Sequence, residues 1–192
     1  ITEKKILRDN DAHKFNLELK KCIKNKIDLV ITIGGVSAGK YDFVPKIISK
    51  FKGKFHFKNS KIRPGKPILF SKLKTNTVFF GLPGNPVSTA ACFRFFVLPY
   101  IFKSLEYTGT KPIKAKLVNK FYKNKHFTRF IKGIHKISKK GSSEFKILKG
   151  QESYKIKPLA TSNAWGQLKN GKSTFNKGDI IDCHTTFGVN FL

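Results

Sequence analysis

The sequence predicts an α/β protein, with a domain built on a parallel sheet over residues 1–107 and a small all-β barrel domain over residues 112–192. Two observations favour this fold class. In the first half, strand patterns such as DLVITI, residues 28–33, alternate with helical patterns, which is typical of a parallel sheet covered by helices. From about Lys111 onward, short alternating runs are separated by glycine-rich or polar turns, which is typical of a small antiparallel sheet or barrel.

The elements of the first half follow from apolar spacing and from proline. Phe15, Leu19, Cys22 and Ile23 recur at helical spacing, so a helix is expected over residues 11–26. The other expected elements are a buried strand at 28–33, a short helix within 41–51 with Pro45 in its first turn, strands within 67–73 and 75–82, and a helix after Pro86.

The second half is expected to contain short strands only. Gly and Pro interrupt the apolar run in EYTGTKP, residues 106–112, which places the domain boundary there. The runs that predict strands are IKAKLV at 113–118, TRFIKGIHKIS at 128–138, EFKILKG at 144–150, YKIKPLA at 154–160 and DIIDCHTTF at 179–187.

The amino-acid composition and the net charge limit the functions that the sequence suggests. A formal net charge of +28 suggests nucleic-acid binding, yet 35 of the 39 basic residues are lysine and only Arg8, Arg63, Arg94 and Arg129 are arginine. Lys, Asn, Ile and Phe can all be encoded with A and T alone, so we favour compositional drift and expect no nucleic-acid partner. Steering of an anionic small molecule remains open. The 40% apolar content excludes disorder. The lack of Met leads us to expect a piece of a longer protein.

The apolar runs, the cysteines and the histidines argue against a membrane span, a disulfide framework and a zinc site. No uncharged apolar run reaches about 18 residues, so no membrane span is expected. Cys22, Cys92 and Cys183 are odd in number and lack a C-x-x-C spacing, which suits a reducing, cytoplasmic location. The histidines show no metal-ligand spacing, so we interpret them as surface or packed side chains.

The first of three notable turns is GGVSAGKYD, which follows the strand ending at Ile33. Gly34, Gly35 and Gly39 permit close backbone approach, and Ser37 offers a hydroxyl. Amides at a strand-to-helix turn carry partial positive charge and suit a phosphate. A glycine-rich turn can also be only a tight turn, and the spacing matches neither G-x-G-x-x-G nor a P-loop.

The second turn is RPGKP. Two prolines restrict the backbone on either side of Gly65 and hold Lys66 beside Arg63. A lysine fixed in this way can act as a point charge on a phosphate, although it can equally be an ordinary exposed turn lysine.

The third turn, GLPGNPVSTAA, contains Gly84. Asn85 is expected to cap a helix that begins at Pro86, which places Ser88 and Thr89 in the first turn, where amides and hydroxyls can hold an oxyanion. The plainer interpretation is a well-capped core helix.

The three turns in this order resemble the molybdopterin-binding α/β domain of the molybdopterin molybdenumtransferases, the family that includes the E domain of gephyrin. The first loop reads Gly34-Gly35-Val36-Ser37, unlike the G-G-T-G of the sister adenylyltransferases. ILRDND, residues 6–11, resembles the family's strand before an acidic turn. FTRFIKG, KPLATSNAWGQL and NKGDIID resemble its C-terminal barrel. The resemblance implies a three-layer domain that is truncated at its N-terminus, without its first strand and helix.

The resemblance also implies an activity: insertion of molybdate into adenylated molybdopterin with release of AMP, assisted by Mg²⁺. It implies Asp42, Asp9 and Lys66 as catalytic residues and Asp42 and Asp9 as metal ligands. Asp11 is an alternative to Asp9, and Asp9 can equally be a helix cap. The implied binding residues are Gly34, Gly35, Ser37, Gly39, Arg63, Gly65, Gly84, Asn85, Ser88 and Ser162, the last of which can equally be a turn residue.

Further expectations follow from the family. Asn59 stands where the family often has lysine, with Lys58 and Lys61 nearby. A homodimer is implied, and the fragment is expected to be inactive alone. Two alternatives stay open: the sister adenylyltransferase activity, and a basic module that contacts RNA or DNA.

Overall fold

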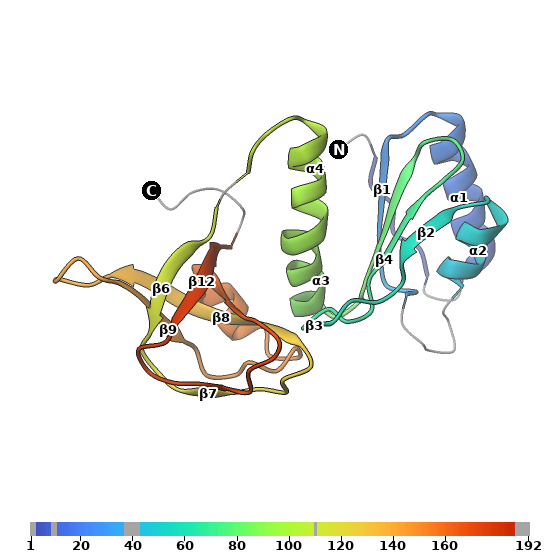
Figure 1. Cartoon of the computed structure of the whole chain (residues 1–192). Helices are drawn as coiled ribbons and strands as arrows, with labels where there is room; N and C mark the ends of the chain where they lie inside the picture. Colours follow the sequence, from blue (N-terminus) through green and yellow to red (C-terminus); the bar gives the residue numbers. More distant parts are fainter. Residues whose placement is uncertain (1–2, 9–10, 37–42, 110, 187–192) are drawn as a thin grey trace. The chain divides into compact units, whose positions relative to one another are not determined.

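The computed structural model describes residues 3–8, 11–36, 43–109 and 111–186, which fold as two compact units (Figure 1). The first unit is Ile1–Ser60 with Pro67–Gly84, and the second is Lys61–Lys66 with Asn85–Leu192. The units therefore do not coincide with the expected domains 1–107 and 112–192. The RPGKP turn and the helix after Pro86 belong by their packing to the second unit, although they precede the barrel in sequence.

The first unit contains a four-stranded sheet in the order β1 (Leu29–Ile33), β5 (Val78–Leu82), β4 (Leu69–Lys72) and β2 (Lys54–Phe57). Only β1 and β5 pair in parallel, whereas β4 is antiparallel to both β5 and β2. The sheet is therefore mixed, and the parallel pairing expected of the α/β pattern is present between β1 and β5. Leu73 donates its N–H to the Thr77 carbonyl at 2.9 Å, which closes a tight turn between β4 and β5. A turn this short can only join antiparallel strands.

Helices α1 (Ala12–Lys24) and α2 (Val44–Lys50) confirm the helices expected over residues 11–26 and within residues 41–51. Both helices lie beside the sheet (Figure 1), and they share an apolar core with it, in which Phe15 and Ile48 pack with Phe79. This unit therefore contributes two of the three expected layers. No regular strand forms in the described residues 3–8, so the strand expected within residues 6–11 is not found there.

The second unit contains a closed barrel of five strands: β6 (Ile113–Leu117), β8 (Thr128–Ile137), β9 (Ser143–Ile147), β10 (Ala164–Leu168) and β12 (Ile180–Thr185). The closed order is β10-β12-β6-β9-β8, with β8 pairing back onto β10, and β3 (Ile62–Arg63) adds to β8 in parallel. Strands β7 (Phe121–Tyr122) and β11 (Thr174–Phe175) form a separate ribbon. The prediction of a small barrel is confirmed.

One predicted strand of the barrel half was wrong. YKIKPLA is a loop followed by helix α5 (Lys157–Thr161). Pro158 lies in the first turn of this helix and has no N–H to give to a ladder. The Lys155 carbonyl accepts a hydrogen bond from the Lys132 ammonium at 3.2 Å, so this carbonyl does not pair with a neighbouring strand.

The helix expected after Pro86 runs as α3 (Pro86–Cys92), a π-helical turn at Phe93–Val97 and α4 (Leu98–Ser104). Its buried face joins the barrel through a cluster that includes Val87, Phe130 and Trp165. Phe95 stacks on Phe130 with ring centroids 3.7 Å apart. This packing explains why the helix folds with the second unit.

Candidate functional site

Two of the three glycine-rich turns meet at one edge of the first unit. Because β1 and β5 are parallel, their carboxyl ends lie at the same edge, where ligands bind in α/β sheets. Gly34 donates its N–H to the Leu82 carbonyl at 2.9 Å. A side-chain carbon at Gly84 would lie 3.7 Å from the Gly34 Cα. The turns after the two strands are therefore neighbours, as the sequence predicts for a ligand-binding edge.

Glycine is required by the backbone of the first turn. Gly34 has φ +92° and Gly35 has φ +67°, a region that other residues rarely adopt. A Cβ at Gly35 would also come within 2.9 Å of the Val44 Cγ2. The expected site residues Ser37, Gly39 and Asp42, and Asp9 in the preceding segment, lie outside the described residues.

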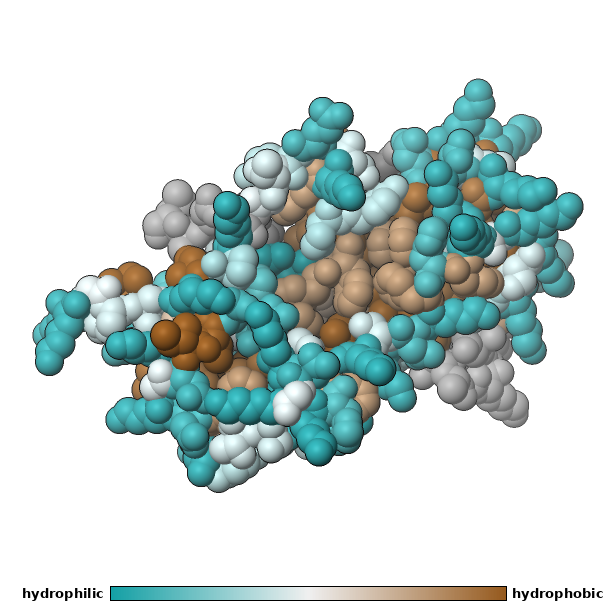
Figure 2. Space-filling model, in the orientation of Figure 1, coloured by the Kyte–Doolittle hydropathy of each residue, from teal (hydrophilic) through white to brown (hydrophobic). Residues whose placement is uncertain are grey.

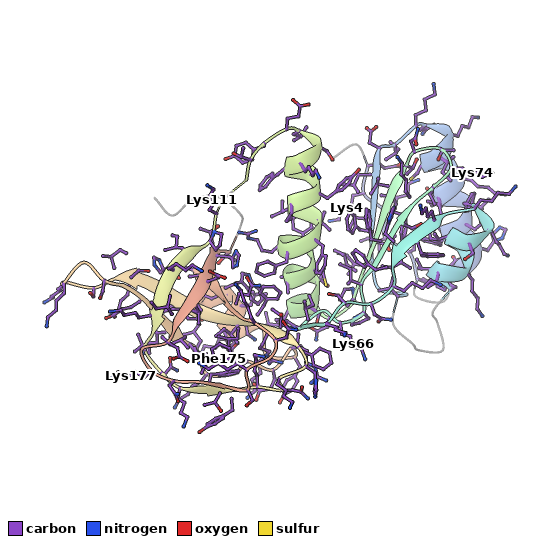
Figure 3. All side chains as sticks on the ribbon, in the orientation of Figure 1. Lys4, Lys66, Lys74, Lys111, Phe175 and Lys177 are labelled. Atoms are coloured by element: carbon purple, nitrogen blue, oxygen red, sulfur yellow. The ribbon has the colours of Figure 1, made fainter. Side chains whose placement is uncertain are left out.

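The RPGKP turn lies against helix α3 within the second unit. The buried Gly65, at φ +102°, accepts a hydrogen bond on its carbonyl from the Cys92 thiol at 3.4 Å. Burial raises the pKa of this thiol to about 12, so it keeps the proton it donates. Arg63 and Lys66 remain exposed on either side of the buried Pro64 and Gly65, and Figure 3 labels Lys66. The backbone of the turn is thus held against α3, while the Arg63 and Lys66 side chains are exposed.

The start of α3 confirms Asn85 as the helix cap. Its Oδ1 accepts the Ser88 N–H at 3.1 Å, and its carbonyl accepts the Thr89 N–H at 2.8 Å. Pro86 takes the first helical position. The buried Ser88 amide, which we expected to be available to an oxyanion, is therefore already bonded to the cap.

The structure thus brings the expected binding residues together in two sets. Gly34, Gly35 and Gly84 belong to the first unit, and the other described candidates belong to the second. Ser162 stands apart in the second unit, because its hydroxyl donates to the Leu159 carbonyl at 2.9 Å and closes the end of α5. That contact supports the interpretation of Ser162 as a turn residue.

Two cations of β8, the buried Lys132 and the half-buried Arg129, were missed by sequence reasoning. Lys132 is 1% exposed and donates to the carbonyls of Gly150, Glu152 and Lys155 at 3.0–3.2 Å. Burial lowers its pKa. Arg129 pairs in register with Arg63 and donates to the Gln151 carbonyl at 2.8 Å. Burial, with the nearby Arg63 charge, lowers the pKa of Arg129. Their only sequence signal was two cations, three residues apart, within one apolar strand.

Metal-ligating side chains do not gather in the described part of the chain, where no three His, Cys, Asp or Glu residues lie close enough to hold an ion. Asp11 accepts the Lys14 N–H at 2.8 Å and caps α1. Helices long and apolar enough to cross a membrane are also lacking among the described residues. Hydrophilic side chains project from both units on the face seen in Figure 2, which agrees with lysines spread through the chain, and apolar surface is visible on the same face.

An edge of glycine turns beside two parallel strands, followed by a small barrel, defines an α/β ligand-binding domain with a β-barrel domain attached. Residues 1–103 match the family model described as "Probable molybdopterin binding domain". Residues 114–185 match the model of the "MoeA C-terminal region (domain IV)". The chain belongs to this molybdopterin-binding family.

Individual relatives agree with the family models. The chain is 32% identical over 182 residues to a molybdopterin molybdenumtransferase of Haemophilus influenzae, covering 92% of this chain and 43% of that protein. It is 31% identical over 179 residues to the protein of that name from Staphylococcus epidermidis, covering 92% and 42%. It therefore spans less than half of these relatives.

The fold matches solved structures as well. A molybdopterin biosynthesis MoeA protein of Pyrococcus horikosii superimposes with a TM-score of 0.71 at 21% identity, covering 94% of this chain and 42% of that chain. At this identity the likeness shows the fold alone, and it agrees with the predicted α/β and barrel architecture.

Proposed function

We propose that this chain is part of a molybdopterin molybdenumtransferase, which inserts molybdate into adenylated molybdopterin and releases AMP. The supporting observation is the pair of glycine turns, Gly34–Gly35 and Gly84, at the carboxyl edge of β1 and β5. The match of both halves to models of one family supports the same reaction.

The turns suit the chemistry of an adenylated pterin. Release of AMP breaks a phosphoanhydride bond, and negative charge develops on the departing phosphate oxygens. Amides of Gly34 and Gly35 can donate to such oxygens, and the exposed Arg63 and Lys66 can neutralise them. We propose that Ser37 and Gly39 extend the glycine loop of the first unit, and that Gly65 and Asn85 hold the turns of the second unit in shape. The Ser88 N–H donates to the Asn85 side chain that caps α3, so it supports this turn and is not a free donor to the ligand.

We further propose that Asp42 and Asp9 hold Mg²⁺, since one or two carboxylates beside a phosphate are its usual protein ligands. Asp9 is favoured over Asp11 because the Asp11 carboxylate already caps α1. When bound, the ion would neutralise phosphate oxygens.

The cellular location, the oligomeric state and the partners are also proposals. The described cysteines are all free thiols, which suits work in the cytoplasm. Homodimerisation through the complete protein is proposed from the family resemblance, with small molecules rather than nucleic acid as the partners. The chain by itself is expected to be inactive.

The test is an AMP-release assay on the protein with all its domains. We expect molybdate-dependent AMP release from adenylated molybdopterin, and a loss of about tenfold to a hundredfold for Lys66→Ala, because one phosphate-binding cation is removed. Lys74→Ala, which removes an exposed lysine from the turn between β4 and β5, is the charge-matched control and should not change the rate. Pyrophosphate release from ATP and unadenylated molybdopterin would instead assign the sister adenylyltransferase activity.

A further inference from the structure

A hollow of about 500 Å³ opens on the surface of the second unit. It lies where the start of β3, the loop before β8 and the turn after β10 come together. Its lining residues are Lys61, Lys125, His126, Phe127, Asn170 and Gly171. A volume of this size is typical of a small-molecule site and exceeds what a bare oxyanion needs.

The ionisable groups around the hollow are basic. Arg63 of β3 pairs in register with Arg129, and Lys61, just before β3, accepts the Thr128 N–H on its carbonyl at 3.0 Å. The Arg63 guanidinium lies over the Phe127 ring at 4.5 Å. Two of the chain's four arginines are therefore neighbours at this one place, in a protein whose basic residues are otherwise lysine.

These cations lack carboxylate partners in the part of the chain that the structure describes. No salt bridge there involves Lys61, Arg63, Lys125 or Arg129. Glu152, whose charge acts on Arg129, forms its own ion pair with Lys155. Like charges held close together repel unless an anion lies between them.

The loop that presents two of the lining side chains is held in place by its own hydrogen bonds. The Lys123 ammonium donates to the Phe127 carbonyl at 2.8 Å, and the Asn124 side chain accepts the His126 N–H at 2.9 Å. Gly171 donates its N–H to the Lys125 carbonyl at 2.7 Å. Because this backbone is already ordered, a ligand would not have to order it.

We propose that this hollow binds an organic phosphate, a phosphate monoester that carries a flat apolar or aromatic group. Lys61 and Lys125 neutralise the phosphate, Arg63 and Arg129 add charge at its edge, and Phe127 provides the apolar wall. The site is formed within the second unit and shares only Arg63 with the proposed molybdenum insertion, and its binding test does not require that reaction.

The test is an NMR titration of the whole chain with phenyl phosphate and with inorganic phosphate. Phenyl phosphate should shift the amides of His126 and Gly171 and bind more tightly than inorganic phosphate. Lys61→Ala with Lys125→Ala should weaken its binding about tenfold or more, because two charge-assisted contacts are lost. The matched control is Lys139→Ala with Lys140→Ala, which removes the same charge from the exposed turn between β8 and β9 and should change binding less than twofold.

A separate variant tests the apolar wall that Phe127 provides. Phe127→Leu keeps most of the buried volume and should reduce the preference for phenyl phosphate over inorganic phosphate. Equal weakening by the two lysine pairs would mean general electrostatic attraction and would overturn the site. So would an absence of shifts at His126 and Gly171, or equal affinity of the wild-type chain for the two phosphates.

Discussion

Gly65→Ala is the substitution whose cost follows most directly from the structure. Gly65 has φ +102°, and an alanine Cβ there would lie 2.6 Å from the Cys92 Sγ and 3.3 Å from the Ile62 Cδ1. The backbone conformation costs about 1–2 kcal/mol for a residue with a Cβ, and the overpacking adds about 1–3 kcal/mol. We therefore expect a loss of about 2–5 kcal/mol in the free energy of unfolding, a large part of a typical domain's stability.

Urea denaturation measures this loss, and two further variants separate its causes. Gly171→Ala is the control for the backbone term alone, since Gly171 has φ +91° and open space around its Cβ position, so it should lose only about 1–2 kcal/mol. Adding Cys92→Ala to Gly65→Ala removes the clashing sulfur and should recover part of the loss relative to Cys92→Ala alone. The packing of this turn on α3 would be refuted if Gly65→Ala lost no more unfolding free energy than Gly171→Ala. It would also be refuted if the double variant recovered none of that loss.

Three other stability predictions follow from named contacts. Asn85→Ala should cost about 1 kcal/mol in urea denaturation because the cap of α3 is lost, whereas Asn59→Ala at an exposed turn should cost almost nothing. Lys132→Met should cost about 2–4 kcal/mol because three carbonyls lose the buried ammonium that donates to them; an unchanged midpoint would contradict the role given to this ammonium. Burial, with Arg94 nearby, lowers the pKa of His184 to about 4, so the unfolded chain binds its proton first as the pH falls. Stability should therefore decrease by about 1–3 kcal/mol between about pH 6.5 and 4 through this residue, and His184→Gln should remove that part of the pH dependence in urea titrations; an identical pH profile in the variant would exclude it.

Local signals in the sequence were enough to predict several elements. Asn85 and Pro86 mark a helix start by cap chemistry and a fixed φ, and the helix begins there. The glycines after Ile33 predict a turn at a strand end, and Gly34 and Gly35 both adopt positive φ. Such features depend on one or two adjacent residues, which a single sequence displays.

Features set by distant residues were missed. The direction of β4 depends on the turn closed by Leu73 and Thr77, not on the strand's own apolar pattern. Strand β10, AWGQL, has no clear alternation, because Gly166 leaves room for Phe145 from across the barrel. The pairing of Arg63 with Arg129 likewise joins residues far apart in the chain. In the candidate site, therefore, the turns were predictable and their buried supports were not.

The most direct test of the proposed reaction compares Asp42→Asn with Asp28→Asn in the protein with all its domains. Asp28 is an exposed acid just before β1, so both variants change the net charge equally. Molybdate-dependent AMP release from adenylated molybdopterin should fall at least about a hundredfold in Asp42→Asn and stay near the wild-type rate in Asp28→Asn. Equal rates in the two variants, with both proteins folded, would contradict the assignment of this turn to the reacting phosphates.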